Sequence, residues 1–303
     1  MMHLTADRKG KIEKEHSLQD CLLEALYSHR LGRMFVRLLT APGVSKAGAG
    51  ILDSRLSAVL IPLFIHHHSI AMEDYELVAY RSFNDFFKRK LAEGARSVQQ
   101  AQNVFVSPCD SRLSVYKIDD ACVFSVKHTK YTVGSLLKSK KLAQRFAGGF
   151  VWVFRLCVDD YHRYIYVDDG IVSKHRRIPG VLHTVNPAAN EVFPIYKENA
   201  REYCLLKSEH FGTVLQMEVG AMFVGRIENH PGERAVRRGE EKGNFAFGGS
   251  TVIVMTQKGQ VLPDGDILRY SGSGVETKVK LGERVGSKRI LKSRPYVQMF
   301  QSQ

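Results

Sequence analysis

The stretch that decides the fold reads Lys242-Gly243-Asn244-Phe245-Ala246-Phe247-Gly248-Gly249-Ser250-Thr251-Val252-Ile253-Val254-Met255. A short aromatic segment enters it, two glycines allow the backbone to bend, and a β-branched segment leaves it. Glycines between two apolar runs are typical of the turn that joins antiparallel strands. The pattern therefore predicts a β-hairpin with the hydroxyl of Ser250 at its bend.

Working outward, the apolar residues recur with a period of two from about residue 101 onward, which indicates β-strands. Gly, Asp, Asn and Pro separate these segments, as expected of turns. One helix is predicted in this part, over residues 133–143 after Thr132. The predicted strands are residues 104–106, 113–116, 123–126, 151–156, 164–167, 214–219, 222–224, 251–255 and 275–279.

The N-terminal part has a different period. Apolar residues between positions 16 and 100 recur at three- and four-residue steps, which predicts helices. The sequence is therefore of the α+β class: a helical N-terminal region over residues 1–100, then a large, mostly antiparallel β domain over residues 101–303. Two of the predicted helices, near residues 53–68 and 80–91, carry apolar faces edged with Arg and Lys. Such faces suit helices that lie on an anionic membrane, although an ordinary helical cap on the β domain would show the same pattern.

Composition narrows the function. The formal net charge of +13 favours an anionic partner: nucleic acid, an acidic lipid surface or an anionic substrate. Five scattered cysteines without a C-x-x-C pair argue against a disulfide framework and a structural zinc site. The first residues lack the apolar core of a secretion signal, and the longest apolar run is too short to span a bilayer. We therefore expect a soluble or peripheral protein.

Polar, reactive groups concentrate in residues 107–112, 159–164 and 247–251. An Asp, a His and a Ser from three strand ends could form a charge-relay set, although spacing alone is weak support for one. The G-x-S-x-G motif of many hydrolases is missing around Ser250. The consecutive residues His66, His67 and His68 do not converge on one ion if they are helical, so no metal site is predicted.

Taken together, these segments resemble the phosphatidylserine decarboxylase proenzymes, a pyruvoyl-dependent family, in its bacterial form with a YHRY core. The similar segments follow one another along most of the chain and are more specific as a series than singly. They are Ser82–Arg89 (FNxFFxR), Ser107–Arg112 (S-P-x-D), Phe124–Leu137, Asp160–Arg163 (DYHR), Pro179–Pro187 (PGxLxxVNP), Lys197–Glu202, Val219–Ile227 (VGAxxVGxI) and Lys242–Thr251 (KGxFxFGGST).

The resemblance implies a self-processing enzyme that breaks its own chain between Gly249 and Ser250. Ser250 would then become a covalent pyruvoyl group, which forms a Schiff base with the substrate amine and replaces any external cofactor. The implied reaction converts phosphatidylserine to phosphatidylethanolamine and CO2.

Its implied site residues are Ser250, His162 as the base, and Asp110 to orient His162. Many members carry a second His where this chain has Ile165. Either His162 serves both self-cleavage and decarboxylation, or His183 substitutes for the missing histidine. Ser111 also replaces the usual Gly.

The same resemblance implies a peripheral enzyme at the cytoplasmic face of the cell membrane. Its partner is phosphatidylserine in an anionic bilayer, and its two fragments stay associated. Whether the enzyme forms a homodimer is left open. The alternatives are a degenerate or differently specific pyruvoyl decarboxylase, and a non-enzymatic basic β protein that binds anionic lipid or nucleic acid. Nucleic acid is disfavoured because the strands alternate mostly with Ser, Thr, Asp and Glu rather than with basic residues and exposed aromatics.

Overall fold

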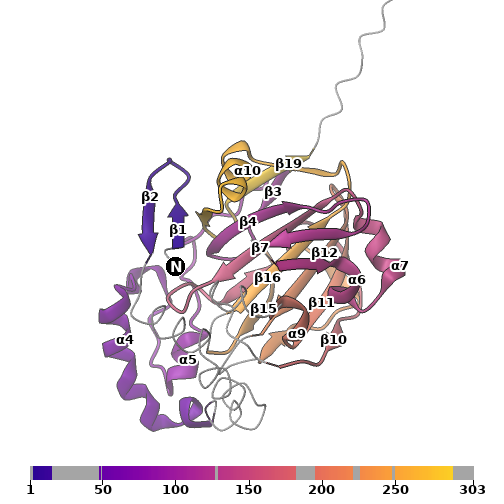
Figure 1. Cartoon of the computed structure of the whole chain (residues 1–303). Helices are drawn as coiled ribbons and strands as arrows, with labels where there is room; N and C mark the ends of the chain where they lie inside the picture. The colour runs from indigo at the N-terminus through magenta and orange to yellow at the C-terminus, as the bar shows by residue number, and fades with distance from the viewer. Residues whose placement is uncertain are drawn as a thin grey trace, which may run out of the picture.

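The computed structural model describes residues 3–15, 48, 50–126, 129–181, 195–220, 226–247 and 250–288. Strands dominate it, and the N-terminal helices lie to one side of the sheets (Figure 1). This arrangement confirms the α+β class. The expected strand over residues 222–224 and the expected helices over residues 16–47 lie outside the described residues.

One large sheet forms the centre of the molecule. Its neighbouring strands pair antiparallel, apart from the parallel pair of β1 with β18. Strand β10 (Arg176–Ile178) pairs with β11 beside the main path. The path runs β14 (Arg234–Val236), β9 (Gly170–Val172), β11 (Arg201–Ser208), β12 (Gly212–Val219), β16 (Ser250–Thr256), β7 (Phe150–Leu156), β4 (Ser111–Lys117), β18 (Glu276–Val279), β1 (His3–Ala6) and β2 (Ile12–Glu15).

Three smaller sheets accompany it. The first has the order β13 (Ile227–Asn229), β15 (Glu241–Phe245), β8 (Arg163–Ile165). The second has the order β17 (Val261–Pro263), β19 (Arg284–Lys288), β3 (Val104–Val106), and the third pairs β5 (Val123–Val126) with β6 (Thr129–Thr132).

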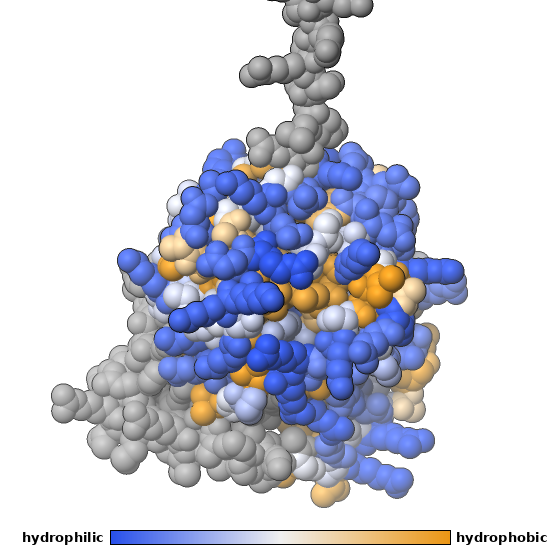
Figure 2. Space-filling view, turned by 90° about the vertical axis from the view of Figure 1, so that its right-hand side faces the viewer, coloured by the Kyte–Doolittle hydropathy of each residue, from blue (hydrophilic) through white to orange (hydrophobic). Residues whose placement is uncertain are grey.

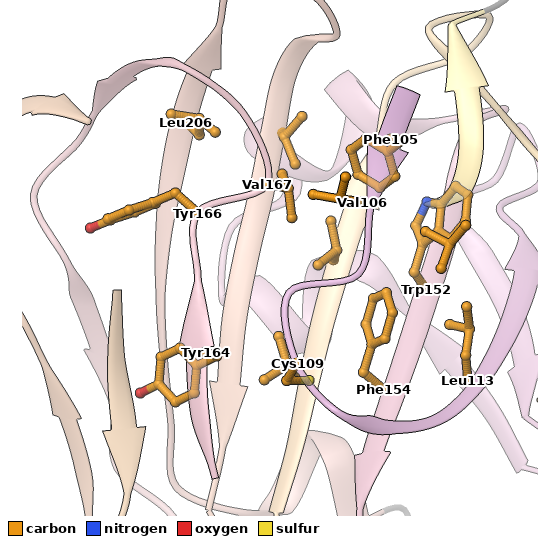
Figure 3. Packing of buried hydrophobic residues seen from close by; sticks show 14 of the residues in the cluster. Phe105, Val106, Cys109, Leu113, Trp152, Phe154, Tyr164, Tyr166, Val167 and Leu206 are labelled. Atoms are coloured by element: carbon orange, nitrogen blue, oxygen red, sulfur yellow. The ribbon is translucent and has the colours of Figure 1, made fainter. Parts of the chain in front are cut away.

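The central strands β7 and β16 are buried on both faces, which explains their continuous apolar sequences. Because side chains alternate across a strand, Trp152 and Phe154 join one core cluster, whereas Val151 and Val153 join the other. Figure 3 shows the first cluster, in which Phe105, Trp152 and Phe154 lie on one side, Tyr164 and Tyr166 on the other, and Val106, Val167 and Cys109 between them. Strand β16 is therefore held by packing on both sides as well as by two neighbouring strands.

The helices are short. In the N-terminal part they are η1 (Arg55–Val59), α4 (Leu60–His68), η2 (Met72–Asp74) and α5 (Phe83–Phe87). Helix α5 begins after Ser82, whose hydroxyl accepts a hydrogen bond from the amide of Asp85 as an N-cap. The others are α6 (Val133–Leu137), α7 (Lys140–Ala143), η3 (Gln144–Phe146), α9 (Ile195–Glu198) and α10 (Gly265–Gly272).

Two expectations need correction. Residues 3–15, expected in a helical region, form the strands β1 and β2 instead. The Arg8 side chain between them binds the carboxylates of Asp264 and Asp266, at 2.9 and 2.7 Å. Tertiary pairing with β18 and these ion pairs stabilise the hairpin, and local sequence reveals neither. The second correction concerns the segment that contains Ser250.

Candidate active site

Strands β15 and β16 flank the glycine pair, but they do not form the hairpin that the sequence predicts. Strand β15 pairs with β13 and β8 in a small sheet, whereas β16 pairs with β12 and β7 in the large one. The hairpin prediction is therefore wrong, and the chain passes from one sheet to another at this point. Glycines permit a sharp change of direction, but they do not specify whether the flanking strands pair.

Ser250 is the first residue of β16 and lies opposite Leu156 of β7. Only 1% of it is exposed, and its hydroxyl has no hydrogen-bond partner among the described residues. Buried hydroxyls normally find a partner, so Ser250 is a candidate functional residue. The adjacent Thr251 hydroxyl also lacks a partner among the described residues.

A second connection joins the same two sheets. The chain leaves β7 at Leu156 and enters β8 at Arg163, and β8 pairs with β15 just as β7 pairs with β16. The amide of Phe245 donates to the carbonyl of His162 at 3.0 Å. His162 therefore lies beside the start of the connection that ends at Ser250.

The orientation of His162 is set by a backbone group. Its Nδ1 lies 2.9 Å from the carbonyl oxygen of Asp160. Since a carbonyl can only accept, Nδ1 carries the hydrogen in the neutral ring and Nε2 holds the lone pair. The ring is 1% exposed and packs against Phe87, with ring centroids 4.1 Å apart. This arrangement leaves Nε2 chemically able to accept a proton.

The loop that precedes His162 is fixed by a buried ion pair. An oxygen of the Asp160 carboxylate accepts from Arg112 at 2.5 Å and from the amide of Cys157 at 2.8 Å. Burial raises the pKa of Asp160, and the nearby charge of Arg112 opposes that rise. Burial also raises the pKa of the Cys157 thiol to about 12, which leaves it protonated at neutral pH. Neither residue was singled out as functional from the sequence.

Asp110 binds one backbone amide and two basic side chains. Its carboxylate accepts from the amide of Leu281 at 2.7 Å and from Arg96 and Lys280 at 3.2 Å each. His162 donates its orienting hydrogen bond to the Asp160 carbonyl, and the role expected of Asp110 in orienting His162 stays a prediction. The turn before β4 directs Asp110 toward residues 280–281, which sequence spacing could not reveal.

Ile165 occupies the position of the family's second histidine. It is buried in an apolar cluster with Tyr75, Tyr161 and Leu281. The backbone amide of Leu281 also donates a hydrogen bond to the Asp110 carboxylate. Leu281 therefore contacts both the cluster that contains Ile165 and Asp110. The other departure imposes no backbone strain, because Ser111 is a strand residue opposite Val279 and its φ is not positive.

A buried polar network connects β15 with β12 and β13. The Lys242 ammonium donates to Glu218 at 2.6 Å and to Asn229 at 3.0 Å. Asn229 donates in turn to Glu218 and Glu202, and the hydroxyl of Tyr164 donates to Asn229. Sequence patterns did not predict this network. A Glu and a Lys within otherwise buried strand patterns could have indicated a buried ion pair, because charged residues are rarely buried unless they are paired.

The expected site residues are only partly described. Ser250, His162 and Asp110 have the positions given above. His183 and Gly249, together with Gly248, lie outside the described residues. The three consecutive histidines lie in the last turn of α4, where His66 and His67 are exposed.

Comparison with known proteins decides the family. The family described as phosphatidylserine decarboxylase matches residues 83–287, which is more than half of the chain. The chain belongs to the phosphatidylserine decarboxylase family. The matched span begins at the first residue of α5 and includes His162, Asp110 and Ser250.

Individual relatives agree. A protein of Clostridium acetobutylicum named phosphatidylserine decarboxylase proenzyme 2 is 43% identical over 91% of this chain and 95% of its own length. A phosphatidylserine decarboxylase proenzyme of Clostridium novyi is 39% identical over 93% of this chain and 98% of its own. One from Clostridium tetani is 41% identical over 78% of this chain and 81% of its own.

Proposed function

We propose that this protein is a phosphatidylserine decarboxylase proenzyme that cuts its own chain between Gly249 and Ser250. The observation that carries the proposal is the Ser250 hydroxyl: buried, without a partner among the described residues, and first in its strand. A glycine before it allows the close approach that a strained peptide bond needs. The names of the relatives, which include the word proenzyme, support a processed chain.

The cut follows from the residues present. The Ser250 hydroxyl loses its proton to Nε2 of His162, and its Oγ bonds to the carbonyl carbon of Gly249. The peptide C–N bond then breaks, the amine nitrogen takes a proton, and an ester remains. Loss of the Ser250 α-proton breaks the Cβ–O bond and releases Gly249 as a carboxylate. The dehydroalanine that remains takes up water and loses ammonia, which leaves a pyruvoyl group.

The pyruvoyl group would supply a ketone that binds the substrate amine and accepts electrons as CO2 leaves. The residues present fit such a group, because the Ser250 side chain is buried and forms no competing hydrogen bond among the described residues. His162, held by Asp160 and Phe87, would return a proton to the substrate carbon. The burial of both residues excludes water that would compete for that proton.

The two fragments would stay associated after the cut. Strand β16 of the smaller fragment lies between β12 and β7 of the larger one. Strand β18 lies between β4 and β1, and β19 pairs with β3. Cleavage therefore leaves three strands of the small fragment bonded into sheets of the large fragment.

We propose a peripheral docking surface on η1 and α4, and name it the α4 face. Apolar side chains on it are largely exposed: Leu56 (86%), Val59 (77%), Leu60 (44%) and Leu63 (68%). Exposed Arg55 directly precedes them in sequence, and basic residues beside apolar ones are typical of helices that lie on anionic lipid. By contrast, the side of the molecule around α7 is mainly hydrophilic (Figure 2), with Lys138, Lys140 and Lys141 exposed.

Aromatic contacts connect the α4 face with the segment that precedes Ser250. Phe64 of α4 packs on Phe83 of α5, and Phe83 packs on Phe247, with ring centroids 5.1 and 5.0 Å apart. In the described part of the chain, no helix is long and apolar enough to cross a membrane. We propose that the enzyme binds the cytoplasmic face of the cell membrane and takes phosphatidylserine from it, attracted by its net positive charge.

A denaturing gel with intact-mass measurement tests the self-cleavage. We expect two chains, residues 1–249 and 250–303, the smaller without a free amino terminus. The Ser250→Ala variant should remain one chain. A wild-type protein that stays whole after long incubation would contradict the proposal. CO2 release from phosphatidylserine vesicles but not from free serine would establish the substrate, and a native mass would decide whether the enzyme is a homodimer.

A further inference from the structure

The segment that leads to Ser250 is held from outside the β-sheets by the short helix α5. Phe83 and Phe87 pack on Phe247 with ring centroids 5.0 and 4.9 Å apart, both at steep angles. Such edge-to-face pairs contribute more than burial alone. Helix α5 and Phe247 thus form one aromatic cluster, although about 160 residues separate them in the sequence.

Within α5, Asn84 makes a polar contact with the same segment. Its Oδ1 accepts from the backbone amide of Phe247 at 3.0 Å, and its Nδ2 donates to Asp53 Oδ1 at 2.7 Å. Asn84 itself is 3% exposed. A carboxylate cannot donate, so Asp53 fixes which end of the amide group faces it. Oδ1 is thereby committed to the amide of Phe247.

We propose that Asn84 is a positioning residue for the self-cleavage of this chain. The inference rests on the proposed function and deepens it. Two glycines separate Phe247 from Ser250, and glycine gives a backbone wide freedom. Pairing with Leu156 fixes Ser250 on the downstream side. The hydrogen bond from Phe247 to Asn84 fixes the upstream side, so the residues on both sides of the glycine pair are held in place.

The same helix contacts the proposed base. Phe87 packs on the His162 ring, and Arg89, which follows the helix, lies 3.3 Å from the carbonyl of Asp159 and 3.5 Å from that of Asp160. The Asp160 carbonyl is the one that orients His162. One rigid element therefore touches both the segment to be cut and the residue that takes the proton. A displacement of about 1 Å between reacting groups can cost about a hundredfold in rate.

The experiment follows self-cleavage of the full-length chain over time. Chains are made by cell-free synthesis, and the fragment 250–303 is measured by intact mass at a temperature well below unfolding. We expect Asn84→Ala to slow its appearance by about ten- to a hundredfold. Ser57→Ala is the matched control, because Ser57 Oγ accepts from the amide of Phe83 at 2.9 Å and so holds α5 without touching Phe247. It should cleave at the wild-type rate even if its melting temperature falls.

Two further variants separate positioning from stability. Asp53 is exposed, so Asp53→Ala should fold normally. Without Asp53 the side-chain amide of Asn84 can flip, so we expect a self-cleavage rate between those of the wild type and Asn84→Ala. The double variant Asp53→Asn with Asn84→Asp restores both hydrogen bonds. The residue 84 carboxylate accepts from the amide of Phe247 as before, and it now also accepts from the side-chain amide of residue 53. The double variant should recover part of the rate that Asn84→Asp alone loses, because the single variant faces two carboxylates toward each other.

The outcomes are distinct. If the wild-type chain stays whole, the proposed function fails. If the wild-type chain cleaves and Asn84→Ala cleaves equally fast, or Ser57→Ala is slowed as much as Asn84→Ala, the positioning role is overturned. If Asn84→Ala does not fold, Asp53→Ala and the double variant provide the test. The positioning role of Asn84 would be overturned if Asp53→Ala cleaved at the wild-type rate and the double variant recovered none of the rate lost in Asn84→Asp.

Discussion

The ammonium nitrogen of Lys242 lies 2.6 Å from a carboxylate oxygen of Glu218, and neither side chain is exposed to solvent. Both belong to strands that border the connection to Ser250, because Lys242 is in β15 and Glu218 lies opposite Val252 of β16. A buried ion pair contributes little net stability, yet removing one partner leaves an uncompensated charge. The pair therefore fixes how these strands pack more than how stable they are.

The first prediction concerns that pair. Lys242→Met should lower the free energy of unfolding by about 3 kcal/mol, because Glu218 would remain buried and charged. The double variant Lys242→Met with Glu218→Gln should recover most of the loss. Urea unfolding in a Ser250→Ala background, where one chain unfolds, measures both. A loss below about 0.5 kcal/mol in the single variant would show that Glu218 is solvated or protonated.

The second prediction concerns the base. His162→Ala should slow self-cleavage by at least about a hundredfold, the usual contribution of a positioned general base. The comparison variant is His183→Ala, which should cleave at the wild-type rate. Intact mass over time distinguishes them. The reverse pattern, with His162→Ala cutting normally and His183→Ala remaining whole, would transfer the role to His183.

The third prediction is a pH dependence of stability. The buried Asp168 carboxylate accepts from Arg238 at 2.6 Å and also from Ser208 and His210. Burial raises the pKa of Asp168, but these hydrogen bonds outweigh it and the pKa is lowered from 3.8. A lowered pKa means that the ionised group stabilises the fold above about pH 4 and that this stability is lost as the pH falls through the folded pKa.

Asp168→Asn should therefore be less stable at pH 7 by about 3 kcal/mol, since Arg238 is left buried without its carboxylate. Its free energy of unfolding should also change less between pH 5 and pH 2 than that of the parent chain, both measured in the Ser250→Ala background. Equal slopes in the two proteins would mean that Asp168 is not responsible for the acid sensitivity.

The fourth prediction tests the α4 face. Leu63→Glu and Leu56→Glu should each weaken binding to phosphatidylserine vesicles by about ten- to a hundredfold, because burying a leucine in lipid stabilises by about 1.5–3 kcal/mol. Sedimentation with vesicles measures the bound fraction. Leu262→Glu is the control, since Leu262 is 50% exposed on β17, away from η1 and α4 in sequence. Equal weakening in all three variants would indicate that added negative charge alone, not the α4 face, is responsible.

The sequence predicted the positions of several strands, because period and β-branched residues are local signals. Strands β3, β7, β12, β16 and β18 all lie where alternation or apolar runs predict them. It did not predict how they pair. The hairpin expected at Gly248-Gly249 would have paired β15 with β16, whereas tertiary packing assigns these strands to two sheets.

The site shows the same division. Residue type and motif singled out Ser250 and His162 as candidates, and both are buried. The group that orients His162 is a backbone carbonyl, and the backbone carries no sequence signal. Asn84 was part of a recognised motif, but its partner Phe247 is distant in the chain, so its contact could be found only from the fold.

The central position of β16 has a consequence for the history of each molecule. Before the cut, the strand enters the sheet as part of one chain, and folding is a first-order process. Afterwards it belongs to a separate peptide, so a denatured mature enzyme could re-form only by a bimolecular encounter that depends on concentration. The proposed cleavage would thus make assembly a single event, and an enzyme once unfolded in dilute solution would be replaced by new synthesis rather than recovered.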